Sequence, residues 1–149
     1  MKLSELMVDS KSAWVEYPGC DGFEVEVVNL SRPELTALRK RCVITKIDKT
    51  TRKPVEELNE DKFVAEFTKA TIKSWKGLKY KYLENLVLVD LTKIKDPEGE
   101  LEYSEESAKD LVSNSAEFDI WVNDTVFDLD NFRSRTTRAD VASAKKVAE

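Results

Sequence analysis

Four helix-start signals constrain the fold of this chain more than any other feature. Ser31, Asn59, Ser104 and Ser115 are side chains that accept hydrogen bonds from the free backbone N–H groups of a first helical turn. Glu34 completes a capping box with Ser31, and acids follow each of the other three caps, where the helix dipole favours negative charge. The sequence therefore predicts helices that begin just after these four positions.

The extents of these helices follow from apolar spacing and from breakers. The first is expected to end near Cys42, and the second to run over 59–76, where Gly77 suits a left-handed stop. The last is expected over 116–133 with an amphipathic stripe. That stripe comprises Phe118, Trp121, Val122, Thr125, Leu129 and Phe132. Residues 78–91 fit either a short helix followed by a strand or one buried helix.

Two segments alternate as strands do before the first helix. Residues 12–17 and 23–30 predict a β-hairpin across a Pro- and Gly-containing turn, with Trp14 on the same face as Phe23, Val25 and Val27. A second hairpin is predicted if the chain becomes extended again at Pro54, after the apolar residues 43–45 and an exposed turn.

The expected fold class is α+β, with N-terminal β-hairpins packed on a mostly helical C-terminal half. Because 149 residues is a common length for one domain, we expect a single domain over 1–133. The apolar pattern fades after residue 133, which predicts a flexible C-terminal tail over 134–149.

The composition argues against most catalytic chemistry. Histidine is absent, which removes the commonest general base and the commonest zinc ligand. The four glycines form no phosphate-binding loop, and Cys20 and Cys42 lack metal-ligand spacing. A carboxylate pair would suffice for a glycosidase, but among 29 acids some pair always looks suggestive. We expect no enzymatic activity, no cofactor and no metal.

The start of the chain and its apolar runs indicate where in the cell the protein is expected. No apolar run approaches a membrane span, and the start lacks the apolar region of a secretory signal. We therefore expect a cytoplasmic protein that binds no membrane.

The charges are unevenly placed. Residues 39–53 contain seven basic side chains and one acid, whereas residues 90–130 contain thirteen acids and three lysines. The two regions either face each other within the fold or guide docking between subunits or partners, which leaves a homo-oligomer possible. The basic stretch has no aromatics for base stacking, so nucleic-acid binding is not expected. The candidate charge patch is Arg39, Lys40, Arg41, Arg52 and Lys53.

The aromatic stripe has two interpretations. The more favoured one packs it on the helix predicted over 59–76, and the other makes it a docking surface, since large aromatics anchor interfaces. The candidate partner-binding residues are Phe118, Trp121, Val122, Leu129, Phe132 and Trp75.

Several short motifs together resemble the tail assembly chaperones of long-tailed bacteriophages and prophages. They are Asp21-Gly22-Phe23-Glu24-Val25, Leu30-Ser31-Arg32-Pro33-Glu34-Leu35, Leu38-Arg39-Lys40-Arg41-Cys42, Trp75-Lys76-Gly77-Leu78, Tyr103-Ser104-Glu105-Glu106 and Ser115-Ala116-Glu117-Phe118-Asp119-Ile120-Trp121. The resemblance covers roughly residues 12 to 133.

The resemblance implies a non-catalytic protein of the host bacterial cytoplasm. Such chaperones bind the tape measure protein, keep it soluble, help recruit tail tube subunits and are left out of the mature virion. The alternatives are a structural tail tube or head-to-tail joining subunit of the virion, and a small regulatory adaptor.

Overall fold

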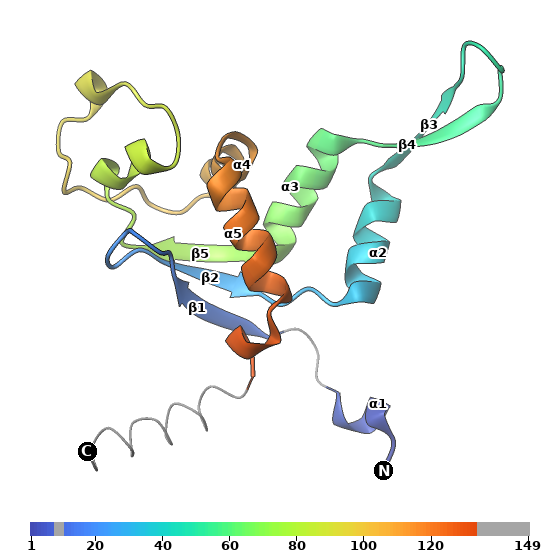
Figure 1. Cartoon of the computed structure of the whole chain (residues 1–149), viewed down its shortest axis with the longest axis horizontal. Coiled ribbons are helices and arrows are strands. Elements are labelled where there is room, and N and C mark those ends of the chain that lie inside the picture. Colours follow the sequence, from blue (N-terminus) through green and yellow to red (C-terminus); the bar gives the residue numbers. More distant parts are fainter. Residues whose placement is uncertain (8–10, 134–149) are drawn as a thin grey trace.

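A three-stranded antiparallel sheet forms the base of the molecule in the computed structural model, which describes residues 1–7 and 11–133. Its strands are β1 (Ser12–Glu16), β2 (Glu24–Val28) and β5 (Ile72–Lys76), in the order β1-β2-β5. Helices α3 (Glu60–Thr71), α4 (Glu105–Asn114) and α5 (Ala116–Phe127) rise above this sheet, with α4 against both of the others (Figure 1). The α+β fold class is confirmed.

Alternation along β2 gives the sheet one buried and one open face. Val25 and Val27 are fully buried beneath the helices, while Glu24 and Glu26 face outward. Trp14 pairs with Glu26 in the register of β1 and β2 and is 41% exposed, so the expectation that it shares the face of Val25 is wrong. The ammonium of Lys76 lies 4.9 Å from the Trp14 ring centroid on the open face.

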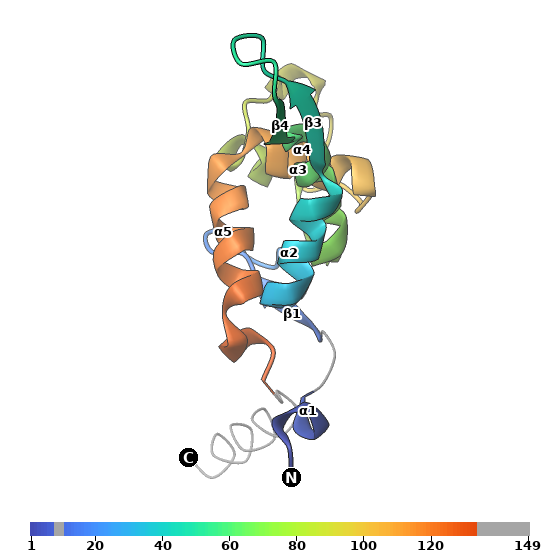
Figure 2. The ribbon, with the colours of Figure 1, turned by 90° about the vertical axis from the view of Figure 1, so that its right-hand side faces the viewer.

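The second predicted hairpin is present and stands apart from the sheet. Helix α2 (Arg32–Arg41) leads into β3 (Val43–Ile47), which pairs with β4 (Pro54–Leu58). This hairpin projects from the body beyond α2 and α3, as two perpendicular views agree (Figures 1 and 2). A short helix, α1 (Leu3–Leu6), lies near the N-terminus.

The predicted caps are confirmed at all four helices. The side chains of Ser31, Asn59, Ser104 and Ser115 each accept a hydrogen bond from the backbone N–H three residues later. Gly77 has the predicted positive φ, at 74°.

The predicted helix over 59–76 is wrong in its second part. Helix α3 ends at Thr71, whose hydroxyl donates to the carbonyl of Phe67 at 2.7 Å, and Ile72 then begins a strand paired with β2. Phe67, Thr71 and Trp75 keep helical spacing in the sequence although Trp75 lies on β5. The sheet partner, which is distant in sequence, overrides that local pattern.

The last helix is shorter than predicted. It ends at Phe127 because Asp128 accepts a hydrogen bond from the N–H of Asp130 at 3.0 Å and starts a 3-10 turn over Leu129–Asn131. The side-chain amide of Asn131 donates to the carbonyl of Thr125 at 3.0 Å, which satisfies an end of the helix.

Residues 78–91 match neither prediction for that segment, and we call the longer segment 78–101 the excursion. The excursion contains 3-10 helices at Tyr80–Asn85 and Leu91–Lys93 and no α-helix or strand. The two ends of the excursion lie together, because Leu101 N–H donates to the carbonyl of Leu78 at 2.8 Å and Tyr80 N–H to that of Gly99 at 2.8 Å. These two hydrogen bonds therefore close the excursion into a loop that lies on one side of the sheet.

None of the helices in the described part of the chain has the length and apolar character needed to cross a membrane. The predicted tail over 134–149 lies outside the described residues.

Candidate functional site

The predicted aromatic stripe forms part of the core. Phe118 and Val122 are fully buried and Phe132 is nearly so, while Trp121 is half-buried and Leu129 is 57% exposed. These buried side chains are enclosed by other parts of the same chain and present no surface to a partner in this conformation. The more favoured interpretation of the stripe, packing within the fold, matches their burial.

The stripe packs on the sheet and its turn. Phe118 stacks on Phe23 with ring centroids 6.4 Å apart, and its centroid lies 5.8 Å from that of Tyr17. Trp121 meets Tyr17 edge-on at 5.0 Å. The partner expected from the sequence was the helix over 59–76, whereas α5 crosses over β2 and contacts α4.

Trp75 connects the core to an open groove. Its indole N–H donates to the carbonyl of Leu101 at 2.9 Å, and its ring meets Tyr103 edge-on at 5.2 Å. With this hydrogen bond made, the 5% exposed ring is fixed at the junction of β5, α4 and the excursion. Trp75, one of the predicted partner-binding residues, lines a cavity.

The groove lies between the excursion and α4 and has a volume of about 460 Å³. Its lining residues are Trp75, Leu83, Val87, Leu88, Leu101, Ser107, Asp110, Leu111 and Asn114. The wall on the excursion is aliphatic, and the polar side chains all come from α4. Apolar lining with a few polar groups is the usual character of a binding site.

Leu88 is the most exposed apolar side chain on the groove. It is fully exposed, although the neighbouring Leu86 is buried. Sequence reasoning missed the groove residues of the excursion, because the run Leu86–Val89 was too short to have a decisive period. A leucine that contacts water over its whole surface gains nothing for the fold and is available to a partner.

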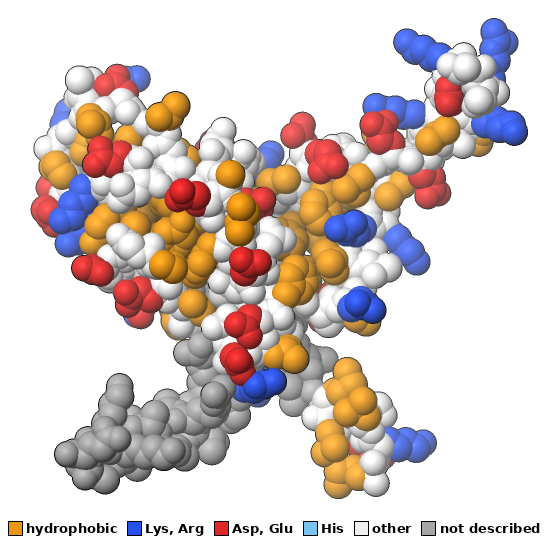
Figure 3. Space-filling model, viewed as in Figure 1, with side chains coloured by type: hydrophobic (Ala, Val, Ile, Leu, Met, Phe, Trp, Pro, Cys, Tyr) orange, Lys and Arg blue, Asp and Glu red, His pale blue; other side chains and the backbone are white. Residues whose placement is uncertain are grey.

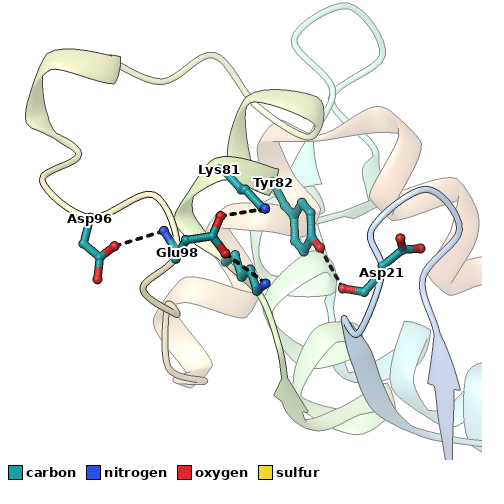
Figure 4. A network of polar contacts seen from close by, with 6 residues as sticks. Asp21, Lys81, Tyr82, Asp96 and Glu98 are labelled. Carbon is teal, nitrogen blue, oxygen red and sulfur yellow. Dashed lines mark hydrogen bonds and ion pairs between the residues drawn. The ribbon is translucent and has the colours of Figure 1, made fainter.

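Polar contacts close the excursion on itself and join it to the turn between β1 and β2, as Figure 4 shows. The carboxylate of Glu98 accepts from Lys81 at 2.7 Å and from Lys79 at 3.0 Å, and the Tyr82 hydroxyl donates to the carbonyl of Asp21 at 2.7 Å. The pKa of Glu98 is lowered by the hydrogen bonds from Lys81 and Lys79, and the pKa of Lys79 is raised by its bond to Glu98. The contacts of Glu98 with Lys81 and Lys79 lie within the excursion, and the hydrogen bond of Tyr82 to Asp21 joins the excursion to the turn between β1 and β2.

The predicted charge patch is divided between two elements. Arg39, Lys40 and Arg41 lie exposed on the last turn of α2, and Arg52 and Lys53 lie at the tip of the β3–β4 hairpin. Arg41 pairs with Glu66 of α3 at 3.9 Å. In the part of the chain that the structure describes, no ion pair joins residues 39–53 to the acids of residues 90–128. Among these described residues, the expected attraction between the two regions is not realised as an ion pair.

The buried reactive groups serve packing. Both cysteines are free and buried, and burial raises the pKa of Cys20 and of Tyr17. Among residues 1–7 and 11–133, no three acids or cysteines lie together in an arrangement that would hold a metal ion. The arrangement offers contact surfaces.

Comparisons with protein families, with curated proteins and with solved structures find no match to this chain.

Proposed function

We propose that this chain is a non-catalytic phage tail assembly chaperone, and that its groove holds an apolar segment of the tape measure protein. The proposal joins two supports. One is the set of motifs over residues 12 to 133 that resemble this class of protein. The other, which carries the proposal, is the aliphatic groove between α4 and the excursion, with a fully exposed leucine at its edge.

The groove has the physical character that a holding chaperone needs. Aliphatic side chains without a fixed hydrogen-bonding pattern accept many apolar sequences, and the surrounding charge keeps the complex in solution. The polar α4 residues Ser107, Asp110 and Asn114 offer partners to the backbone or polar side chains of the bound segment. Under this proposal the chain acts in the host bacterial cytoplasm, helps recruit tail tube subunits and is absent from the mature virion.

The direct test is co-expression with the tape measure protein of the same phage. The chain should raise the soluble fraction of that partner, and Leu88→Asp should abolish the effect because it places a charge at the groove edge. Since Leu88 is fully exposed, this variant should keep the stability of the parent chain.

Leu129→Asp is the matched control, because Leu129 is also exposed but belongs to the aromatic stripe predicted over 116–133. It should leave solubilisation unchanged. If Leu129→Asp abolished the effect and Leu88→Asp did not, partner binding would belong to the stripe and the groove would be excluded.

The structural alternatives differ in where the chain is found. A tail tube or head-to-tail joining subunit would be present in stoichiometric amounts in purified particles. A chaperone would be present only in lysates of infected cells. An adaptor would leave the solubility of the tape measure protein unchanged. Recovery of the chain from washed virions would overturn the chaperone proposal.

A further inference from the structure

The β3–β4 hairpin stands alone in the fold. Its two strands pair only with each other among the described strands, and Ile47 and Val55 are 71% and 46% exposed. An isolated two-stranded hairpin is marginally stable in water, and exposed aliphatics on it give no packing energy. These features are typical of a surface that is covered by another molecule.

The tip of the hairpin is strongly basic in a chain with a net charge of −5. Figure 3 shows Lys and Arg side chains gathered there. Lys46 pairs with Glu57 at 3.1 Å, but no carboxylate among the described residues pairs with Lys49, Arg52 or Lys53. The tip therefore presents three uncompensated cations.

The single acid of the tip is already used by the loop itself. The Asp48 carboxylate accepts from the backbone N–H of Thr50 at 2.7 Å and of Thr51 at 3.4 Å. Its own N–H donates to the carbonyl of Lys53 at 3.0 Å, and its carbonyl accepts from the N–H of Arg52 at 2.7 Å. These bonds define the tip and fix the positions from which the cations extend.

Arg52 occupies a backbone conformation that suits another residue better. Its φ is +55°, and it is the non-glycine residue with positive φ in the described part of the chain. Glycine or asparagine adopts this conformation at lower cost than arginine. The tip thus carries a guanidinium where the turn alone favours glycine.

We propose that the β3–β4 hairpin is a docking arm for an acidic surface of another protein. Lys49, Arg52 and Lys53 pair with carboxylates of the partner, and Ile47, which lies on the opposite face of the hairpin from Val55, covers apolar area beside them. Nucleic acid fits less well, because residues 43–58 contain no aromatic side chain for base stacking and the chain as a whole is acidic. The arm is separate from the groove, so the inference does not depend on the proposed function.

The test uses the full chain and a fluorescein-labelled peptide of four Glu-Glu-Leu repeats, followed by fluorescence anisotropy. Binding should weaken at least about tenfold between roughly 50 and 500 mM salt, because it depends on exposed charges. A triple variant, Lys49→Gln, Arg52→Gly and Lys53→Gln, should weaken it by roughly tenfold or more. Since glycine suits the turn at position 52, the hairpin should remain folded, as amide chemical shifts of Thr50 and Thr51 would show.

The matched control removes three exposed cations elsewhere, with Arg32→Gln, Lys69→Gln and Lys109→Gln. It makes the same change in net charge and should change affinity less than about twofold if the arm is the site. Ile47→Ser should weaken binding by a few-fold while leaving the salt dependence unchanged, because it removes apolar contact only.

Three outcomes would overturn the proposal. One is no binding of the peptide at millimolar concentration, and another is equal loss in the triple variant and its control. The third is displacement of the labelled peptide by a twelve-nucleotide poly-dT strand at the same concentration at which the unlabelled peptide displaces it. That result would identify a general polyanion site. Sedimentation velocity is a further measurement. Self-association that is lost in the triple variant would identify the occupant as a second copy of this chain instead of a different acidic protein.

Discussion

Gly77 joins two turns that are far apart in the sequence. It has φ +74°, and a Cβ built there would lie 2.0 Å from the carbonyl oxygen of Gly22. The turn between β1 and β2 therefore rests directly on the backbone that follows β5. The positive φ predicted for Gly77 is confirmed, but this glycine follows strand β5 and does not end a helix, and its contact with Gly22 depends on the tertiary fold.

Gly77→Ala is expected to destabilise the fold through both strain and collision. The left-handed backbone alone costs about 1 kcal/mol for a residue with a Cβ, and the clash adds enough to give a loss above about 2 kcal/mol. Urea denaturation followed by tryptophan fluorescence would measure it. Gly19→Ala is the control, because Gly19 has φ +85° but nothing within 4 Å of its Cβ position. Equal losses in the two variants would show that the Gly22 contact is unimportant.

Phe118 separates the two interpretations of the aromatic stripe. Because its ring is fully buried against Phe23 and Tyr17, Phe118→Ala should cost about 3–5 kcal/mol of unfolding free energy. Leu129→Ala, at an exposed site of the same stripe, should change it by less than about 0.5 kcal/mol. Chemical denaturation of both variants tests this. A Phe118→Ala protein with parental stability but no partner binding would show that the ring is a docking anchor.

At the scale of elements, local signals predicted where helices begin and failed where tertiary contacts decide. The caps at Ser31, Asn59, Ser104 and Ser115 act within one turn, so the sequence alone identifies them. Strand β5 was missed because its pairing with β2 joins residues about fifty positions apart, as in Val25 with Trp75. Trp75 was thus selected as a candidate for the wrong local reason, and the groove beside it was not predicted.

The closure of the excursion on itself should depend on pH. Hydrogen bonds from Lys81 and Lys79, which belong to the same excursion, lower the pKa of Glu98 from its ordinary value of 4.5. A carboxyl with a lowered folded-state pKa stabilises the closed excursion above its ordinary pKa, and the contribution is lost as the pH falls through the lowered value. Protection of the Tyr80 and Lys81 amides from hydrogen exchange should therefore fall below about pH 4, relative to amides of β2.

Glu98→Gln is the variant that assigns this effect. It should show weakened protection of the same amides already at pH 6 and a smaller change on acidification. Asp90 also has a lowered pKa, through hydrogen bonds from Thr92, and it remains intact in this variant. An unchanged acid response in Glu98→Gln would attribute the pH dependence to Asp90 or to another acid.

On the scale of the whole molecule, the sequence predicted which charges the surface carries better than where those charges lie in space. The basic and acidic regions were recognisable from the sequence, but their separation in space was not, because nothing local fixes the direction in which a hairpin extends. The basic hairpin points away from the body, and the described ion pairs leave Lys49, Arg52 and Lys53 without carboxylates. Opposite charge in a sequence therefore did not predict contact within the fold.

The body of the molecule should fold without the hairpin. Replacing residues 44–57 with an Asn-Gly turn joins Val43 to Leu58, which already face each other as the innermost strand pair. The deleted residues are almost all exposed, so the unfolding free energy should change by about 1 kcal/mol or less. Urea denaturation and the amide spectrum of β1, β2 and β5 would measure this.

The shortened chain should keep Leu88-dependent solubilisation of its partner and lose binding of the acidic peptide, because the groove and the arm are built from different elements. Loss of both activities in a folded, shortened protein would show that the two surfaces form one site.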